Sequence, residues 1–179
     1  MPSPVGHSLA AIAVGWAVNR PAGSRRALVA QTATLAAIGI APDLDLLWGH
    51  HEAQTHSVGA ALVVAAIVAW RRWPIGADTR ARLFVAAFLV YLIHPVMDAF
   101  AIDNNPPIGV MLWWPFSHAY VHSSHAFFAP ISRYWSRPET WPNNFMAAAH
   151  EILWLAPFVA LAWFARTLKR QRGKGPKRQ

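Results

Sequence analysis

Histidine and carboxylate side chains gather in two short stretches of this 179-residue chain, each beside apolar sequence. The first stretch contains Asp43 and Asp45, directly after Pro42, and then His51 and His56. Because the chain has no cysteine, any metal ion would be held by imidazole and carboxylate, which suit zinc, manganese or iron. The stretch favours a metal site, although two such carboxylates also often cap or solvate the end of a helix.

The second stretch runs from His94 to Asp98 and lies inside an apolar segment. Side chains at positions i and i+4 of a helix share one face, so these two residues can reach one ion. Ionisable residues are costly within a membrane segment and are usually functional there. Two alternatives stay open: a His–Asp hydrogen bond inside a helical bundle, and a role for Asp98 in orienting a histidine ligand.

Further histidines and one glutamate are less specific candidates. His7 precedes the first apolar segment and is either a ligand or a surface histidine. His118 and His122 would share a face only if their segment were helical. Glu151 is a candidate ligand or general base, or a carboxylate that is satisfied at the start of a helix. The histidines to which the sequence assigns no role include His125 and His150.

The predicted ligands outnumber the four that a tetrahedral zinc ion takes, so the site would hold one or two divalent ions. They are His7, Asp43, Asp45, His51, His56, His94 and Asp98. A metal ion lowers the pKa of bound water towards about 7, which suits hydrolysis of an ester, a phosphoester or an amide, and two ions favour a phosphoester. The predicted catalytic carboxylates, which would position or deprotonate that water, are Asp45 and Glu151.

Five apolar segments must position these side chains, and they cover residues 8–18, 27–41, 57–70, 83–102 and 145–168. The chain is 55% hydrophobic and 13% charged, whereas a soluble domain carries about 25% charged residues. A full membrane span needs about 20 apolar residues, which the fourth and fifth segments reach; the third is borderline and the first two are short.

The sequence therefore predicts an all-α, polytopic helical membrane protein of about five apolar helices, with the metal site at one membrane face. Residues 1–168 would form a single helical membrane domain, and residues 169–179 a basic, flexible tail. The alternative is a soluble helical bundle with unusually apolar helices.

The charges divide between the two predicted faces of the membrane. All nine histidines and every acidic residue except Asp78 fall on one face. Of the sixteen Lys and Arg residues, only Arg133 and Arg137 fall outside the opposite, basic face. The positive-inside rule makes the basic face and its C-terminal tail cytoplasmic, so the metal site would lie on the non-cytoplasmic face. The net charge of +8 thus reflects membrane topology and contact with membrane lipids, and no nucleic-acid partner is expected.

The order of these motifs resembles the YdjM-like family of LexA-regulated, membrane-bound metal-dependent hydrolases. The matching elements are Gly6-His7, Ala41-Pro42-Asp43-Leu44-Asp45, the segment from His51 to His56-Ser57, the segment from His94 to Asp98, and the stretch from Pro106-Pro107 to Trp114-Pro115. Together they cover residues 6–117. Glu52-Ala53 replaces the Arg-Gly that follows the equivalent of His51 in the family, which implies different handling of an anionic substrate.

The resemblance implies a membrane-bound metal-dependent hydrolase and no particular substrate. Together with the two-ion argument above, we expect a bacterial inner membrane enzyme that uses a divalent metal, zinc before manganese or iron, to hydrolyse a phosphoester of a lipid or of a small envelope metabolite. The ligand order is also distantly similar to zinc-dependent phospholipase C and related nucleases, but their late His-x-x-x-Glu motif is absent. Two other hypotheses remain: a non-catalytic metal-binding or metal-transport protein, and a purely structural His–Asp cluster. Transport would require polar residues along the spans, and residues 58–69 contain none.

Overall fold

A computed structural model describes residues 1–47, 51–104, 106–132, 134 and 136–172. Its α-helices are α1 (Pro4–Val18), α2 (Arg25–Ile40), α3 (Val58–Arg71), α4 (Arg80–Ala99) and α5 (Trp141–Arg172). Over the ranges described there is no strand, only two isolated bridges in the segment between α4 and α5. The predicted all-α fold with five apolar helices is confirmed. Arg133 and the end of the predicted basic tail, residues 173–179, lie outside the described residues.

Hydroxyl side chains fix where the first four helices begin. Each accepts a hydrogen bond from a backbone N–H of the first turn, which would otherwise have no partner. These N-cap residues are Ser3, Ser24, Ser57 and Thr79. Because caps are polar, the helices begin before or at the edges of the apolar segments from which they were predicted.

α2 ends at Ile40, shortly before Pro42, but the helical path does not stop there. It continues as a 3₁₀-helix, η1 (Ala41–Leu47), in which a proline near the start sacrifices no hydrogen bond. The prediction that this second segment is short is therefore wrong. The paths that are long and apolar enough to cross a membrane are Arg25–Leu47, Arg80–Ala99 and Pro138–Gln171, whereas α1 and α3 are shorter.

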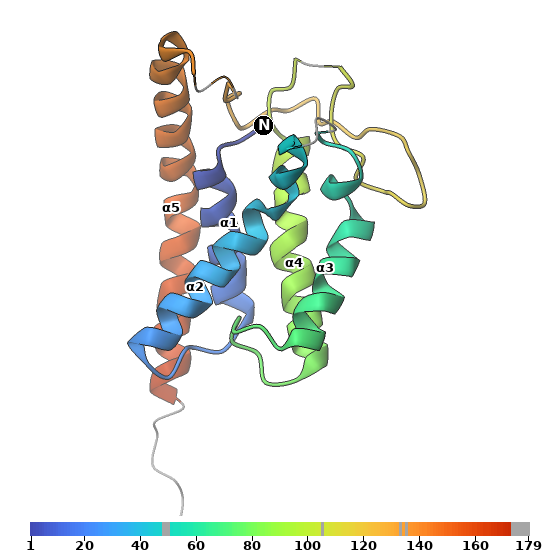
Figure 1. The fold of residues 1–179 in the computed structure, drawn as a ribbon. Helices are drawn as coiled ribbons and strands as arrows, with labels where there is room; N and C mark the ends of the chain where they lie inside the picture. The colour runs from blue at the N-terminus through green and yellow to red at the C-terminus, as the bar shows by residue number, and fades with distance from the viewer. Residues whose placement is uncertain (48–50, 105, 133, 135, 173–179) are drawn as a thin grey trace, which may run out of the picture.

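The helices form a bundle with two chemically different ends (Figure 1). α1 packs against α2, α4 and α5, and α3 packs against α4. The starts of α1 and α3 meet the ends of η1 and α4 at one end, which we call the site end. The loops 19–24 and 72–79 and the last turns of α5 lie at the opposite end, which we call the basic end.

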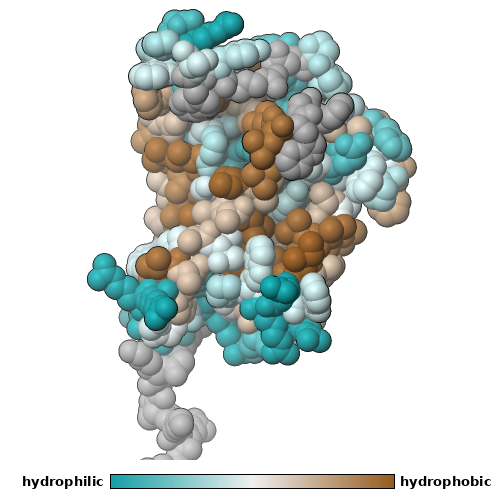
Figure 2. Space-filling model, in the orientation of Figure 1, coloured by the Kyte–Doolittle hydropathy of each residue, from teal (hydrophilic) through white to brown (hydrophobic). Residues whose placement is uncertain are grey.

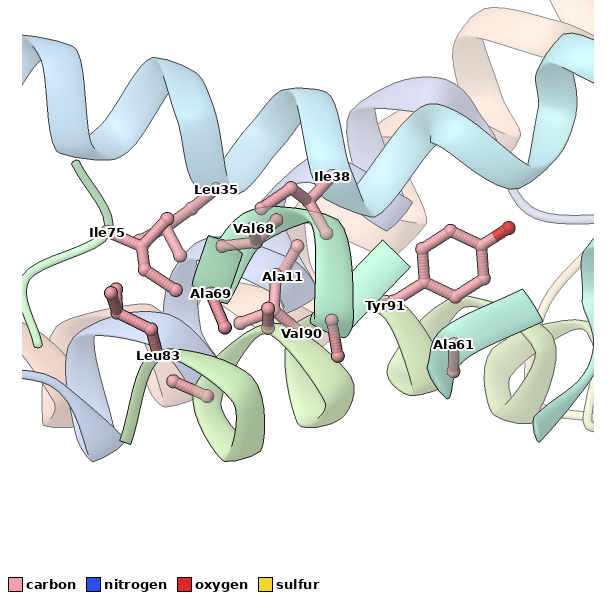
Figure 3. Packing of buried hydrophobic residues seen from close by; sticks show 13 residues of the cluster. Ala11, Leu35, Ile38, Ala61, Val68, Ala69, Ile75, Leu83, Val90 and Tyr91 are labelled. Atoms are coloured by element: carbon pink, nitrogen blue, oxygen red, sulfur yellow. The ribbon is translucent and has the colours of Figure 1, made fainter. Parts of the chain in front are cut away.

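Small and branched apolar side chains fill the core between α1, α2, α3 and α4. Ala11, Leu35, Val68 and Val90 are fully buried there and converge from the four helices (Figure 3). Alanine at such contacts lets helices approach closely, which is typical of helices packed in a membrane.

On the face shown in Figure 2, the surface is largely apolar across the middle of the bundle and hydrophilic at both ends. On α5, Leu153 and Leu161 expose 73% and 66% of their surface. Large apolar patches of this kind are unfavourable in water and favourable in a lipid bilayer. The surface therefore supports an integral membrane protein over a soluble bundle.

Candidate metal centre

Four ligand-type side chains converge at the site end, and we call them the central quartet: Asp43, His56, His94 and Asp98. His94 Nε2 lies 3.1 Å from His56 Nε2, 3.1 Å from Asp98 Oδ2 and 3.4 Å from Asp43 Oδ1. His56 Nε2 lies 3.5 Å from Asp98 Oδ2 and 3.7 Å from Asp43 Oδ1. Asp43 comes from η1, His56 ends the 3₁₀-helix η2 (Gln54–His56), and the other two lie one turn apart on α4.

These separations are those of ligand atoms around one ion. Zinc bonds of about 2.0–2.2 Å in tetrahedral geometry place neighbouring ligand atoms about 3.3 Å apart. Both carboxylate oxygens of Asp43 and both of Asp98 are buried without a hydrogen-bond partner. Each such atom would cost about 1–3 kcal/mol if it stayed unsatisfied, and a bound cation removes that cost. The quartet could therefore hold a divalent metal ion with nitrogen and oxygen ligands.

The backbone of α2 orients His94. Its Nδ1 donates a hydrogen bond to the carbonyl of Gly39 at 2.6 Å, which leaves Nε2 free to face the other members of the quartet. A side chain at position 39 would overlap the methyl group of Ala11 and come within 3.0 Å of the His7 carbonyl. Glycine at this position therefore permits the close approach of α1 and α2 on which the centre depends.

Asp45 orients His56 and does not join the quartet. Its Oδ2 lies 3.2 Å from His56 Nδ1 and accepts a hydrogen bond from Thr55 Oγ1 at 2.5 Å, while Oδ1 lies 2.7 Å from His51 Nδ1. Burial alone would lower the pKa of His56, but the adjacent carboxylates of Asp43 and Asp45 raise it. Since both oxygens are engaged by protein groups, the structure places Asp45 behind a ligand, whereas the sequence predicted a ligand and catalytic role.

Exchanging Asp45 for asparagine separates these two roles. We expect Asp45→Asn to weaken metal affinity about 10–100-fold, as the loss of an orienting partner typically does. Asp43→Asn should weaken it further, because it removes the charge of a ligand oxygen. A competition titration against a coloured zinc chelator measures both affinities. Equal losses in the two variants would make Asp45 a ligand.

His7 extends the centre on the side of α1. Its ring stacks on that of His94, with centroids 3.5 Å apart and planes inclined by 13°. Its Nε2 lies 3.4 Å from Asp98 Oδ1, and both ring nitrogens are buried without a hydrogen-bond partner. Asp98 thus offers one oxygen to the quartet and the other to His7, an arrangement that suits either a fifth ligand or a second ion.

His51 and Glu52 form the partly exposed rim of the centre. His51 Nε2 lies 2.8 Å from the sulfur of Met1 and 3.9 Å from Glu52 Oε1. Burial and the nearby charge of Asp103 raise the pKa of Glu52. The side chains of His51, Glu52 and Asp43 keep 10–12% of their surface exposed, whereas those of His56 and Asp98 keep none. Access from solvent is therefore through this rim.

Glu151 binds the start of α1 and not the quartet. Its oxygens accept hydrogen bonds from the backbone N–H of Ser3, at 2.8 Å, and from the Ser3 hydroxyl. It also lies well inside α5, which begins at Trp141, so the prediction of a helix-start carboxylate is wrong. The sequence could not reveal this pairing, because Ser3 and Glu151 stand at opposite ends of the chain.

Removal of this carboxylate should affect stability and not chemistry. We expect Glu151→Ala to lower the free energy of unfolding by about 1–3 kcal/mol, because Ser3 loses buried acceptors. Turnover per bound metal ion should stay unchanged. Denaturant unfolding and metal-normalised activity measure the two effects. Unchanged stability with lost turnover would instead make Glu151 a catalytic residue, as the sequence analysis predicted.

The histidines between α4 and α5 stay outside the centre. Residues 118–122 are not helical, so His118 and His122 do not share a helical face. His122 Nε2 lies 3.1 Å from the carbonyl of Ala101, and His125 Nδ1 lies 3.2 Å from the Ser124 hydroxyl. On α5, His150 accepts a hydrogen bond from the Trp154 indole at 2.8 Å.

Two residues that hydrogen-bond around the centre were not predicted from the sequence to do so. Thr55 donates to Asp45, and the Tyr91 hydroxyl donates to the Thr55 carbonyl at 2.8 Å. Tyr91 lies one turn before His94 on α4, so helical spacing could have identified it as a neighbour of the centre. Thr55 precedes His56 directly, but nothing in its local sequence indicates the contact with Asp45.

Comparison with known proteins agrees with the motifs. The family model of the YdjM inner membrane protein matches residues 1–172, well beyond the stretch 6–117 that carries the motifs, and includes α5. The comparisons with curated proteins and with solved structures gave no match. The match and the apolar helices indicate an integral protein of the inner membrane. This chain belongs to the YdjM inner membrane protein family.

Proposed function

We propose that this inner membrane protein is a metal-dependent hydrolase. Its substrate would be a phosphoester, either of a lipid or of a small envelope metabolite. The observation that carries the proposal is the central quartet, whose ligand atoms lie 3.1–3.7 Å apart and whose carboxylate oxygens have no hydrogen-bond partner. A bound divalent ion, zinc before manganese or iron, supplies Lewis acidity and lowers the pKa of its water to about 7.

The protein residues prepare the centre for this chemistry. The Gly39 carbonyl fixes His94 and the Asp45 carboxylate fixes His56, so two ligands are held before an ion binds. His7 and the second oxygen of Asp98 provide room for a further ligand or ion, and two ions suit in-line displacement at phosphorus. The exposed rim at Asp43 and His51 gives a substrate its approach.

The apolar core of the bundle favours the hydrolase hypothesis over metal transport. Below the centre, Ala11, Leu35, Val68 and Val90 are fully buried apolar residues between four helices. A transport path would require polar groups along the spans. Zinc flux into proteoliposomes, without turnover of any phosphoester, would favour transport.

The test is metal content and turnover of the purified protein. We expect His56→Ala and Asp98→Ala each to lose bound zinc, measured by mass spectrometry of the metal, and hydrolysis of bis(p-nitrophenyl) phosphate and of phospholipids. His125→Ala is the matched control, because His125 is an exposed histidine away from the quartet. Unchanged metal occupancy in both variants refutes the site. Bound metal without turnover on any phosphoester refutes the hydrolase.

We further propose that the metal centre faces the non-cytoplasmic side, with the basic end and the C-terminal tail in the cytoplasm. The chain has no cysteine, so single cysteines report sidedness without background. We expect a membrane-impermeant maleimide to label Ser123→Cys from outside intact spheroplasts and Ser24→Cys only after lysis. Equal labelling of both positions from one side would refute this topology.

A further inference from the structure

Three buried side-chain donors lack a hydrogen-bond partner near the basic end. Within the described ranges they are Trp16 Nε1, Asn19 Nδ2 and one terminal nitrogen of Arg166. The unpartnered atoms of the metal centre include four carboxylate oxygens, whereas those near the basic end are all N–H groups. Since a buried donor without an acceptor is unfavourable, this end suits a ligand rich in acceptor oxygens.

Arg166 is the charged member of this group and is only 5% exposed. One terminal nitrogen donates to Gln31 Oε1 at 2.7 Å, and the guanidinium carbon lies 5.5 Å from the Trp16 ring centroid. The guanidinium is thus held in place between α1, α2 and α5 while its other terminal nitrogen stays unpartnered. A buried cation of this kind normally faces a counter-anion.

An apolar groove of about 710 Å³ lies between α1, α4 and α5. On α5 it runs from Trp154 to Ala165, a length of roughly 16 Å at 1.5 Å per residue. Half of the hydrocarbon core of a bilayer is about 15 Å thick. The groove therefore matches an acyl chain of one leaflet in length and polarity.

The basic side chains of Lys169 and Arg166 lie near one end of this groove. Ala17 lines the groove, and the Lys169 ammonium donates to the Ala17 carbonyl at 2.6 Å. Arg166 and Lys169 each follow a lining residue of α5, Ala162 and Ala165, by one helical turn. An acyl chain in the groove would thus bring its phosphate to Lys169, next to Arg166 on α5.

We propose that this groove binds an anionic phospholipid, with one acyl chain between α1, α4 and α5 and the phosphate at the Arg166–Lys169 end. The proposed topology also supports this ligand, because it places the basic end at the cytoplasmic leaflet. Anionic lipids concentrate in that leaflet and are attracted by lysine and arginine. The site is separate from the metal centre and does not depend on hydrolysis.

The test is native mass spectrometry of the full chain titrated with phosphatidylglycerol, phosphatidylcholine or inorganic phosphate. We expect one phosphatidylglycerol per chain, bound at least about fivefold more tightly than phosphatidylcholine. Lys169→Gln and the groove-filling Ala165→Leu should each weaken binding about fivefold or more. Their controls are Arg26→Gln, an exposed arginine of the basic end, and Ala160→Leu, an exposed alanine of α5 outside the groove.

Equal weakening by Arg26→Gln and Lys169→Gln would reduce the effect to general charge attraction and overturn the proposal. Equal affinity for the two lipids would exclude a phosphate-end site that prefers an anionic lipid. Inorganic phosphate binding as tightly as the lipid, with Ala165→Leu without effect, would leave an anion site and refute the lipid. All three outcomes can be measured on proteins that retain Arg166 and its contact with Gln31.

Discussion

Removing the metal from the purified protein is expected to lower its melting temperature by about 10 °C. An ion that binds only the folded state at 1,000 times its Kd stabilises that state by about 4 kcal/mol, and each kcal/mol shifts the melting temperature of a chain of this size by about 2–4 °C. The physical cause is the set of unpartnered carboxylate oxygens on Asp43 and Asp98, which carry uncompensated charge once the ion leaves. Intrinsic fluorescence of the ten tryptophans reports the melting.

Asp98→Asn provides the control for this experiment. The amide keeps the shape of the side chain but removes its charge, so the variant should bind metal poorly and melt at the same temperature with and without chelator. Asp78→Asn, at an exposed carboxylate paired with Arg20 and Arg82 at the basic end, should respond to chelation as the wild type does. An unchanged wild-type melting temperature after proven metal loss would contradict the assignment of the quartet.

The fold was predictable wherever the signal was local. Apolar runs predicted the five helices, and the alternation of basic and acidic segments predicted that His7, Asp43 and Asp98 would share one end of the bundle. The continuation of α2 into η1 was not predictable, because a proline that ends an α-helix can equally begin a 3₁₀-helix. Within η1, Asp45 contacts His51, Thr55 and His56, and these contacts are not visible in the local sequence.

The metal centre, too, was predictable only where the signal in the sequence was local. The i, i+4 spacing was enough to place His94 and Asp98 on one face of α4. The difference between Asp43 and Asp45 could not be read from a motif in which both look alike, since it follows from the contacts of Asp45 with His51, Thr55 and His56. Spacing reports the face of a helix, whereas the division between a ligand and its orienting partner is a tertiary property.

Adding a single methyl group at position 39 is expected to disable the centre. In Gly39→Ala the new Cβ would overlap the methyl group of Ala11 and press on the His7 carbonyl 3.0 Å away, so α1 and α2 must separate. Overpacking of this kind typically costs about 1–3 kcal/mol. Because the Gly39 carbonyl orients His94, metal affinity should fall about 10–100-fold as well.

Two further variants distinguish a steric effect on the centre from a general effect of losing a glycine. Gly23→Ala should leave the melting temperature and metal affinity nearly unchanged, because a Cβ at Gly23 meets no atom within 4 Å. Ala11→Gly in the Gly39→Ala background removes the methyl group that would be overlapped, and should restore part of both quantities. If the double variant stays as weak as Gly39→Ala alone, the overlap with Ala11 is not the cause. The close approach of α1 to α2 would then not account for the loss, and the His94–Gly39 hydrogen bond would remain as the feature to test.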